Sequence, residues 1–582
     1  MSIYIGDKSI YNWAMNSEVK VCQNCKNNFT IEPDDFSFYE KMKVPPPTWC
    51  PECRLIRRLA STNERVLYHR TCDFDGKNIL SMFPKDAPFP VYETEIWYSD
   101  QWDPYDYGMD YDFSRPFFEQ FLELQNKVPR MALVRQGKSI NSPYVHRVSD
   151  PRNSYMVFRA TSPEDSMYSY ISNGMRQCVD CFMVNDSELC YECINCERCY
   201  HLLFGQESTE CRDSSFLYAC NNCSNCVGCV NLRNKEYCIW NEQYTKEDYF
   251  KKIKELELNT ASGLTKMELS FNAFRKKFPQ RSTFSLKSNE ISGNWFTNCE
   301  NVHNSFGCFN VKDGKYLFAV FNSEDCMDFF EWGNQAELIY ESENCGLNIS
   351  RISFSSQCWT GASDLTYCDS CPGAHHCFGC IGLKKGEYSI LNKRYSKEEY
   401  ELLVEKIKQQ MNKLPYRNSR GIEYRFGEHF PNEICPFAYN ETAAVDFFPL
   451  TKEEAIAKGF RWKDREKRNY TTTIEAKNLP ETIAEVPDSI VNEIISCEEK
   501  DSPYSVGAFK IASDELSFYR KMDLPLPHVC FDVRHTRRLS KRPQIQIQKR
   551  NCSNCNKVVE TLYTETFAPI LYCEECYQQE VI

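Results

Sequence analysis

The sequence predicts a mixed, β-rich multidomain protein in which two cysteine-clamped end domains flank a tandem, cysteine-rich parallel β-solenoid with helical caps. Three observations lead to this fold class. The chain begins and ends with the same motif, cysteines recur at regular spacing through its middle, and one closing segment occurs after each cysteine-rich block. With 582 residues, 42% of them hydrophobic, the chain has room for about three to five folded domains.

Two CxxC pairs mark the N-terminal end. Cys22-x2-Cys25 is followed by Cys50-x2-Cys53, which begins 25 residues after Cys25. This spacing is typical of a structural zinc site, in which four thiolates surround one tetrahedral ion and leave no position open for water. The segment between the pairs is too short to fold by apolar burial alone, so the metal would supply the missing stability.

The C-terminal end carries a second quartet of the same kind: Cys552, Cys555, Cys573 and Cys576. We name the N-terminal quartet zinc 1 and the C-terminal quartet zinc 2. Each quartet saturates one ion, so we expect about two Zn²⁺ ions per chain, both with structural roles.

The two ends are copies of one domain. Residues 509–539 repeat residues 29–59 without a gap, with 15 of 31 positions identical. At the same offset, the C-terminal copy has lost three ligands of zinc 1 and keeps only Cys530; Ser502, Ser505 and Val533 stand at the other three positions. In the opposite direction, the N-terminal copy has Cys72, Asp75, Glu93 and Ile96 where zinc 2 has its ligands. We infer an ancestral domain with two zinc ions, of which each copy has kept a different one.

The N-terminal motif resembles a known family. The residues that carry the resemblance are Cys22-Gln-Asn-Cys25, Phe29, Phe38-Tyr39 and Pro47-x2-Cys50-x2-Cys53-Arg54. They resemble the probable zinc-ribbon family of bacterial proteins. The whole chain, including Cys435-Pro436-Phe437 and Trp462, resembles uncharacterised cysteine-rich zinc-ribbon proteins of uncultivated bacterial lineages. The resemblance implies zinc-ribbon or treble-clef-like end domains, the C-terminal one degenerate, and it brings no established activity.

Regular cysteine spacing predicts the middle of the chain. Cys178, Cys199 and Cys220 are 21 residues apart, and the spacing in a second block, from 299 to 380, is 19. A period near 20 predicts a parallel β-solenoid, because one coil cannot bury its own inner face and like residues stack into ladders. Residues 228–249 match residues 379–400 at 11 of 22 positions, and each copy opens a helix that we expect to cover the end strand of its block.

Cysteines three residues apart occur in two runs, Cys190–Cys199 and Cys220–Cys229. Such runs can pack in the solenoid core, bind extra zinc or hold an iron–sulfur cluster. We favour packing, because several of these residues belong to the regular ladders and the fourth cysteine lacks the x3-Cys-Pro spacing of a cluster motif.

The predicted domains follow the chain in order. They are a zinc-ribbon domain (1–95), an aromatic and helical connector (96–149), a first β-solenoid block with cap helix (150–257), a helical linker (258–284), a second β-solenoid block with cap helix (285–411), a small α+β module (412–496) and the degenerate zinc domain (497–582). Thr451-x2-Glu454 is a capping box and predicts a helix in the α+β module.

The composition and the missing motifs argue against several classes of protein. No apolar run is long enough for a membrane span, and no phosphate loop, dinucleotide-binding glycine pattern or nucleophile elbow is present. The N-terminal residues do not read as a signal peptide, and the odd count of 33 cysteines, together with CxxC pairing, points to a reducing compartment, so we expect a cytoplasmic protein. The alternative is a disulfide-rich secreted protein.

Basic residues follow the second CxxC position at both ends, although the net charge is −12. They are Arg54, Arg57, Arg58, Arg534, Arg537, Arg538, Lys541 and Arg542. They can contact phosphates, or they can form a solvated helix face or pack against acidic residues of the same chain. We expect a non-enzymatic scaffold that binds a macromolecule, with RNA or a ribonucleoprotein as the favoured partner. The alternative is a redox (iron–sulfur) or carbohydrate-active enzyme that uses the solenoid.

Overall fold

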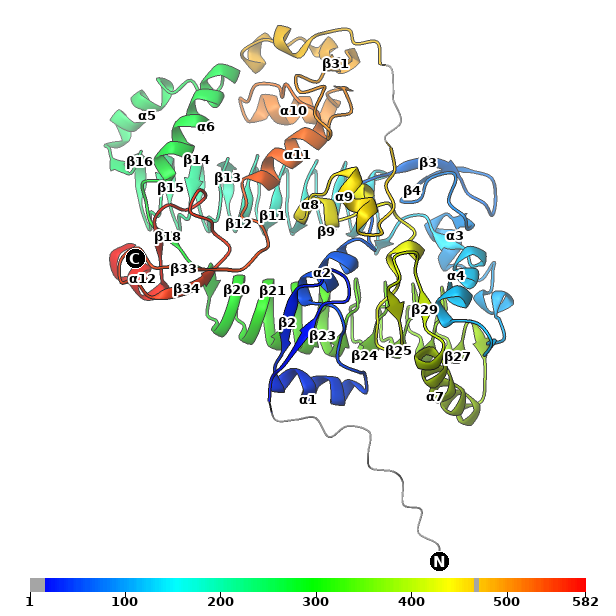
Figure 1. Ribbon diagram of the computed structural model, residues 1–582. Helices are drawn as coiled ribbons and strands as arrows, with labels where there is room; N and C mark the ends of the chain where they lie inside the picture. The colour runs from blue at the N-terminus through cyan, green and yellow to red at the C-terminus, as the bar shows by residue number, and fades with distance from the viewer. Residues whose placement is uncertain (1–15, 465–469, 582) are drawn as a thin grey trace, which may run out of the picture. The chain divides into compact units, whose positions relative to one another are not determined.

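The computed structural model describes residues 16–464 and 470–581, which form two compact units (Figure 1). Unit 1 contains residues Met1–Ala132 and Thr283–Lys463, and unit 2 contains Leu133–Ser282 and Asp464–Ile582. Each unit joins one solenoid block to one end domain. The pairing is crosswise in sequence, because the N-terminal domain belongs with the second block and the C-terminal domain with the first. The first 15 residues of the predicted N-terminal domain lie outside the described residues.

The first block, in unit 2, is a parallel β-solenoid. Its parallel strands are β7 (Arg135–Gln136), β8 (Val145–Ser149), β9 (Val157–Thr161), β10 (Tyr170–Asn173), β11 (Phe182–Asn185), β12 (Ile194–Glu197), β13 (Tyr200–Leu203), β14 (Arg212–Tyr218), β15 (Ser224–Val230) and β16 (Glu236–Ile239). A short antiparallel strand, β17 (Glu242–Gln243), closes the block. The parallel strands begin at Arg135, ahead of the predicted boundary at 150.

The second block, in unit 1, repeats this architecture in one ten-stranded sheet. Its strands are β19 (Ser285–Leu286), β20 (Asn289–Thr297), β21 (Glu300–Lys315), β22 (Phe318–Met327), β23 (Phe330–Tyr340), β24 (Ser350–Ser353), β25 (Ser363–Thr366), β26 (His375–Phe378), β27 (Glu387–Ile390) and the antiparallel β28 (Lys393–Arg394). The predicted parallel solenoid is therefore confirmed in both blocks.

The coil is shorter than predicted. Partners in adjoining strands are 12 residues apart, as in Phe182 and Ile194, and 13 apart around Ser350 and Ser363. A left-handed backbone conformation recurs at every third residue over long stretches, so a 12-residue coil consists of four three-residue steps. The predicted period near 20 was wrong, because inward cysteines at three-residue spacing also recur at 21, which is a multiple of three.

The cysteine ladders change accordingly. Cys178 lies beside Cys190 in the next coil, so Cys178, Cys199 and Cys220 do not share one ladder as predicted. Twelve buried cysteines belong to the core of the first block and nine to that of the second. The Cys178 thiol donates weak hydrogen bonds to the carbonyls of Arg176 (3.4 Å) and Ser187 (3.5 Å). Cysteine therefore fills a narrow interior and also reaches carbonyl groups there, which is the packing role that we favoured.

The predicted cap helices are present. They are α5 (Lys246–Lys254) and α7 (Lys397–Lys413), and the side chains of Thr245 and Ser396 accept hydrogen bonds at their N-termini. Tyr249 packs on Tyr237 of the last coil of the first block, with ring centroids 5.6 Å apart. These helices cover the last coil of each block, where an uncovered strand would expose its backbone groups. In unit 2, α6 (Ala261–Arg275) lies against β14 and β15.

The two end domains have the same order of elements. In unit 1 they are β1 (Glu18–Val21), β2 (Asn28–Ile31), α1 (Pro33–Met42), α2 (Pro51–Leu59), β3 (Tyr68–Thr71), β4 (Asn78–Ser81), β5 (Val91–Tyr92) and α3 (Thr94–Tyr98). In unit 2 they are β31 (Ile495–Ser496), β32 (Ala508–Phe509), α10 (Ser513–Lys521), α11 (Phe531–Ser540), β33 (Gln548–Asn551), β34 (Val558–Thr561), β35 (Leu571–Tyr572) and α12 (Glu574–Val581). The fold is thus duplicated over the whole domain, beyond the 31 residues that align without a gap.

A strand that precedes each solenoid block completes each end domain. β6 (Arg130–Met131) runs parallel to β5 in unit 1, and β18 (Gln280–Arg281) runs parallel to β35 in unit 2. The strand that precedes the first block therefore belongs to the end domain of unit 1, and the strand that precedes the second block belongs to the end domain of unit 2. The connector helix of unit 1 is α4 (Phe117–Lys127), with Pro116 at its N-cap.

The remaining elements are short. In unit 1 they are β29 (Tyr416–Arg417), β30 (Glu423–Tyr424), α8 (Ala444–Phe447), α9 (Lys452–Ala457), and the 3-10 helices η1 (Pro104–Tyr107), η2 (Asn432–Ile434) and η3 (Tyr439–Glu441). In unit 2 they are the 3-10 helices η4 (Ala476–Asn478), η5 (Ile483–Glu485) and η6 (Asp488–Asn492). The capping box of Thr451 and Glu454 opens α9, as predicted. Within the described part of the chain, no helix combines the length and apolarity that a membrane span requires.

The 12-residue coil can be tested at Cys193, which is fully buried in the first block. Serine occupies the same coil position two turns earlier, at Ser169, so we expect Cys193→Ser to change the urea midpoint little. Cys193→Leu adds bulk to a packed interior and should lower the free energy of unfolding by about 1–3 kcal/mol. Urea unfolding curves of both variants measure this difference. A tolerated leucine together with a destabilising serine would contradict the assigned coil register.

Candidate metal centres

The four cysteines of zinc 1 come together from a hairpin and a helix end. Cys22 and Cys25 lie in the turn between β1 and β2, Cys50 is the N-cap of α2, and Cys53 lies in its first turn. Their sulfur atoms all lie within 4.8 Å of one another, and those of Cys25 and Cys50 are 3.7 Å apart. Sulfur ligands at about 2.3 Å from a tetrahedral ion are about 3.8 Å apart, so the quartet fits one metal ion.

The zinc 2 quartet has the same construction. Cys552 and Cys555 lie in the turn between β33 and β34, and Cys573 and Cys576 lie at the start of α12. The sulfur atoms of Cys555 and Cys573 are 3.7 Å apart. Among the residues that the structure describes, these two quartets are the groups of three or more candidate ligands that meet within 4.8 Å. Both predicted sites can therefore hold a metal ion.

Backbone amides favour the thiolate form in both quartets. The amide of Cys50 donates to the sulfur of Cys22 at 3.2 Å, and the amide of Cys573 donates to that of Cys552 at the same distance. Hydrogen bonds from Cys50 and Cys53 lower the pKa of Cys22. Burial opposes ionisation of Cys552, but backbone hydrogen bonds, first from Cys555, lower its pKa to about 6. Thiolates are the form that binds metal.

The second site of the N-terminal copy keeps its shape without a cysteine quartet. The amide of Glu93 donates to the sulfur of Cys72 at 3.4 Å, in the same way as Cys573 and Cys552. Asp75, at the second ligand position, forms an ion pair with Lys77 at 2.9 Å, and Ile96 is buried at the fourth position. The hairpin and the helix thus stay in contact at a position where three ligands have been replaced.

The corresponding remnant in the C-terminal copy contains a residue that the sequence alignment missed. Cys497, not Ser502, takes the place of Cys22, because the amide of Cys530 donates to the Cys497 sulfur at 3.3 Å. Ser505 lies 3.8 Å from the Cys530 sulfur, as Cys25 lies 3.7 Å from Cys50. Cys497 and Ser505 are eight positions apart, whereas Cys22 and Cys25 are three apart. An alignment without a gap therefore places Ser502, and not Cys497, opposite Cys22. The remnant therefore keeps two cysteines, and the prediction that only Cys530 survives was wrong.

The predicted nucleic-acid residues of α2 lie buried against the second solenoid block in unit 1. Arg54 pairs with Asp328 at 2.6 Å, Arg57 with Glu341 at 2.6 Å, and Arg58 with Asp328 at 3.3 Å. Asp328 and Glu341 occupy the same corner of successive coils. We name these five residues the unit 1 lock. All five are at most 3% exposed, so this lock fastens the end domain to the solenoid.

Unit 2 contains an equivalent lock on the first block. Arg534 pairs with Asp180 at 2.9 Å, and Arg538 pairs with Asp180 at 2.8 Å and with Glu192 at 2.6 Å. Asp180 and Glu192 also share one corner of successive coils. We name these four residues the unit 2 lock. The metal ligands of zinc 1 changed in this copy, but the arginines that correspond to Arg54 and Arg58 kept their role.

Three basic residues of the predicted set lie beside the unit 2 lock. Arg537 pairs with Glu499 and its side chain is 54% exposed. Lys541 pairs with Glu268 at 2.8 Å. Arg542 is buried, with its guanidinium 4.2 Å from the centre of the Phe182 ring. Six of the eight predicted phosphate-contact residues are therefore buried: Arg54, Arg57, Arg58, Arg534, Arg538 and Arg542.

The locks hold charged groups in the interior. Burial opposes the charge of Arg54, but attraction to Asp328 outweighs it, and the pKa of Arg54 rises above its usual value. Asp180 has the same effect on the pKa of Arg534. When one partner of such a buried pair is removed, the other charge is left uncompensated, which typically costs about 3–5 kcal/mol.

Aromatic residues of the end domain pack on the solenoid beside each lock, in the same way in both units. In unit 1, the rings of Phe38 and Tyr39 from α1 lie 6.0 Å and 5.4 Å from that of Tyr340. In unit 2, Phe518 and Tyr519 of α10 lie 6.1 Å and 5.9 Å from Tyr191 in the same way. Both target tyrosines directly precede the second acidic residue of the lock. Such ring pairs add apolar burial and geometric specificity to the ion pairs.

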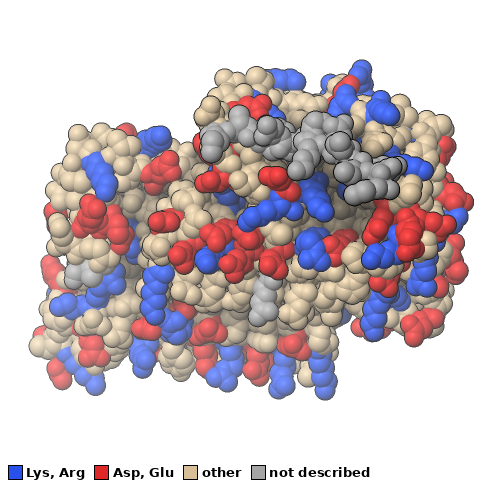
Figure 2. Space-filling model, turned by 90° about the horizontal axis from the view of Figure 1, so that it is seen from below, with Lys and Arg blue, Asp and Glu red and all other residues tan. Residues whose placement is uncertain are grey.

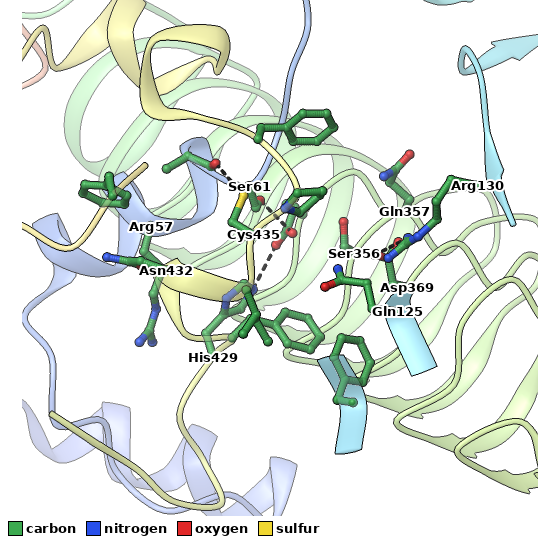
Figure 3. Close-up of a pocket in the computed structure, with 18 of the residues that line it drawn as sticks. Arg57, Ser61, Gln125, Arg130, Ser356, Gln357, Asp369, His429, Asn432 and Cys435 are labelled. Carbon is green, nitrogen blue, oxygen red and sulfur yellow. Dashed lines mark hydrogen bonds and ion pairs between the residues drawn. The ribbon is translucent and has the colours of Figure 1, made fainter. Parts of the chain in front are cut away.

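Unit 1 also encloses a small cavity of about 40 Å³, lined by both apolar and polar side chains and shown in Figure 3. His429 lies 3.0 Å from a carboxylate oxygen of Glu343, and Ser61 donates to the other oxygen at 2.8 Å. The Cys435 thiol donates to the carbonyl of Ala60 at 3.1 Å, and burial raises the pKa of this thiol to about 11. The cavity has room for about three water molecules. Its cysteine is protonated near neutral pH and does not provide an activated nucleophile.

Two cysteines in equivalent positions give a test of the metal sites. Cys50→Ser should lower the metal content from two ions per chain to one, because a ligand of zinc 1 is lost. Cys530→Ser should leave two ions, since its remnant lacks a quartet. Elemental analysis of the purified variants measures both values. An equal loss of metal in the two variants would contradict the assignment.

The unit 1 lock predicts a large effect from one buried arginine. Arg54→Met should lower the free energy of unfolding by about 3–5 kcal/mol, because Asp328 is then buried without its main partner. Arg537→Met, at an exposed pair on the equivalent helix of unit 2, should cost less than about 1 kcal/mol. Urea unfolding curves measure both changes. Adding Asp328→Leu to Arg54→Met should recover part of the loss, and a further loss would argue against the lock.

No protein-family model matches this chain, and no curated protein sequence matches it either. The resemblance of the N-terminal motif to a zinc-ribbon family therefore stays a prediction. What the structure establishes is two quartets of cysteines that can hold metal ions, one in each unit, beside a β-solenoid.

Proposed function

We propose that this chain is a non-enzymatic, zinc-stabilised scaffold that binds a macromolecule. The observation that carries the proposal is the position of zinc 1 directly at the start of α2, the helix whose arginines are buried on the solenoid. An ion bound there fixes the helix that docks the end domain. Four thiolates without a carboxylate or water ligand suit Zn²⁺ in a structural role.

Two hollows of unit 1 do not favour a carbohydrate-active enzyme. The cavity beside His429 is too small for a sugar ring. An open groove of about 530 Å³ near Tyr105 contains one carboxylate, Asp110, which pairs with Lys393. Most glycoside hydrolases require two carboxyl groups that flank the bond. The cysteines of the solenoid, which an iron–sulfur enzyme would require, pack in the cores instead.

RNA or a ribonucleoprotein is the partner to test first, through the two residues of the predicted set that are not buried, both in unit 2. Arg537 is the most exposed residue of the predicted set, and Lys541 lies one helical turn further along the same segment. Figure 2 shows acidic and basic side chains interspersed over the face that it presents. Since the whole chain has a net charge of −12, binding would depend on a few cations rather than on a broad basic surface. We also propose that the protein acts in the cytoplasm, as its cysteine usage suggests.

RNA binding measured against salt concentration tests the partner. Each phosphate contact that is removed flattens the logarithmic salt dependence by roughly one unit, so Arg537→Ala with Lys541→Ala should flatten it by about two. Lys251→Ala, at an exposed lysine of α5 in the same unit, serves as the matched control and should leave the slope unchanged. Absence of binding at low salt, or an equal effect of all variants, would contradict RNA as the partner.

A further inference from the structure

The remnant of zinc 1 in unit 2 holds two thiols and lacks a metal quartet. Cys497 and Cys530 occupy the positions of Cys22 and Cys50, and their other two neighbours are Ser505 and Val533. The residues that replaced the lost ligands cannot bind a soft ion in their place, because one offers a hydroxyl and the other a hydrocarbon. Two cysteines nevertheless remain side by side in unit 2, at the position that corresponds to the zinc 1 site of unit 1.

We propose that Cys497 and Cys530 form a reversible disulfide that takes the place of the lost metal ion in unit 2. The bond would join the turn between β31 and β32 to the N-terminus of α11, as the ion joins the β1–β2 turn to α2 in unit 1. A covalent link across this contact restrains the same two elements that a metal ion would restrain. The docking helix would then be held by a metal ion in unit 1 (α2) and by a disulfide in unit 2 (α11).

The surroundings of Cys497 favour its role as the attacking thiolate. A hydrogen bond from the Cys530 thiol lowers the pKa of Cys497 to about 5, and the Cys530 amide also donates to its sulfur. Cys530 is the N-cap of α11, a helix of ten residues, and a helix N-terminus stabilises negative charge nearby. Ionised thiols of this kind are the reactive ones in disulfide chemistry.

A peroxide can supply the oxidation. The Cys497 thiolate attacks one oxygen of hydrogen peroxide, the O–O bond breaks, and the departing hydroxide takes a proton to become water. The sulfenic acid formed on Cys497 is then attacked by the Cys530 sulfur, so that the S–S bond forms and the S–O bond breaks. The hydroxyl leaves as water with the Cys530 proton. Two thiols and one peroxide thus give one disulfide and two water molecules, and a dithiol reductant reverses the change.

The other cysteines are placed differently. The cysteines of the solenoid cores are buried inside continuous coils, and thiols such as Cys178 and Cys193 donate to backbone carbonyls. The eight cysteines of the two quartets are ligands when metal is bound. Cys497 is also buried, but it lies directly before the loop 498–506, in which every residue is half-buried or exposed. It therefore lies at the edge of its domain, where a molecule as small as hydrogen peroxide can approach, and not inside a continuous coil.

The experiment uses the full-length chain loaded with Zn²⁺ and treated with hydrogen peroxide. Free thiols are then alkylated under denaturing conditions, and peptides are identified by mass spectrometry. We expect a peptide pair that links Cys497 to Cys530 with the loss of two hydrogens to be the first disulfide to appear, and dithiothreitol to abolish it. In Cys497→Ser this linked pair should be absent, and Cys530 should be recovered in alkylated form.

Cys72→Ser is the matched control, because Cys72 is the cysteine of the other remnant and has no second cysteine at its ligand positions. This variant should form the Cys497–Cys530 link at the wild-type rate. A second readout is cleavage of the loop 498–506 by an added protease, which should slow several-fold on oxidation in the wild type and not in Cys497→Ser. Recovery of Cys497 and Cys530 as free thiols, while quartet or core cysteines have become linked, would overturn the proposal.

Discussion

Both units depend on arginines of a helix that reach a pair of acidic residues at one corner of a solenoid. Such an ion pair is stable in the interior only when every charge meets its partner at close range, because burial of an unpaired charge is costly. The helix must therefore be held at a defined angle. In unit 1, Cys50 and Cys53 place metal ligands at the first turn of α2, four residues before Arg54 and Arg57 respectively, so metal binding and docking act on the same short helix.

The solenoid provides the matching constraint. Three-residue steps force every third side chain inward, and the narrow interior admits small residues, mainly cysteine, serine and valine. Successive coils then present equivalent corners at a fixed spacing, which is how Asp180 and Glu192 come to face one helix together. The regularity that accounts for the high cysteine content therefore also builds the acidic half of each lock.

Much of this architecture could be predicted from the sequence, and the failures have physical causes. Ligand quartets and capping boxes have local signatures, so Cys552 and Thr451 could be placed from spacing and residue type alone. In the first block, the coil length was misjudged because any multiple of three, such as 21, looks periodic when every third residue is alike. Cys497 was missed because a longer turn breaks the gapless alignment. The role of Arg54 was open because Asp328 is 274 residues away, and no local pattern announces such a contact.

Hydrogen exchange with and without a metal chelator tests most directly whether metal holds the docking helix in place. Amide protection of α2 in unit 1 should fall on chelation, because the ion that orients Arg54 toward Asp328 is gone. The equivalent helix α11 in unit 2 has the same lock without a quartet at its start, so its protection should persist in the same sample. Unchanged protection of α2, or an equal loss in α2 and α11, would contradict this account.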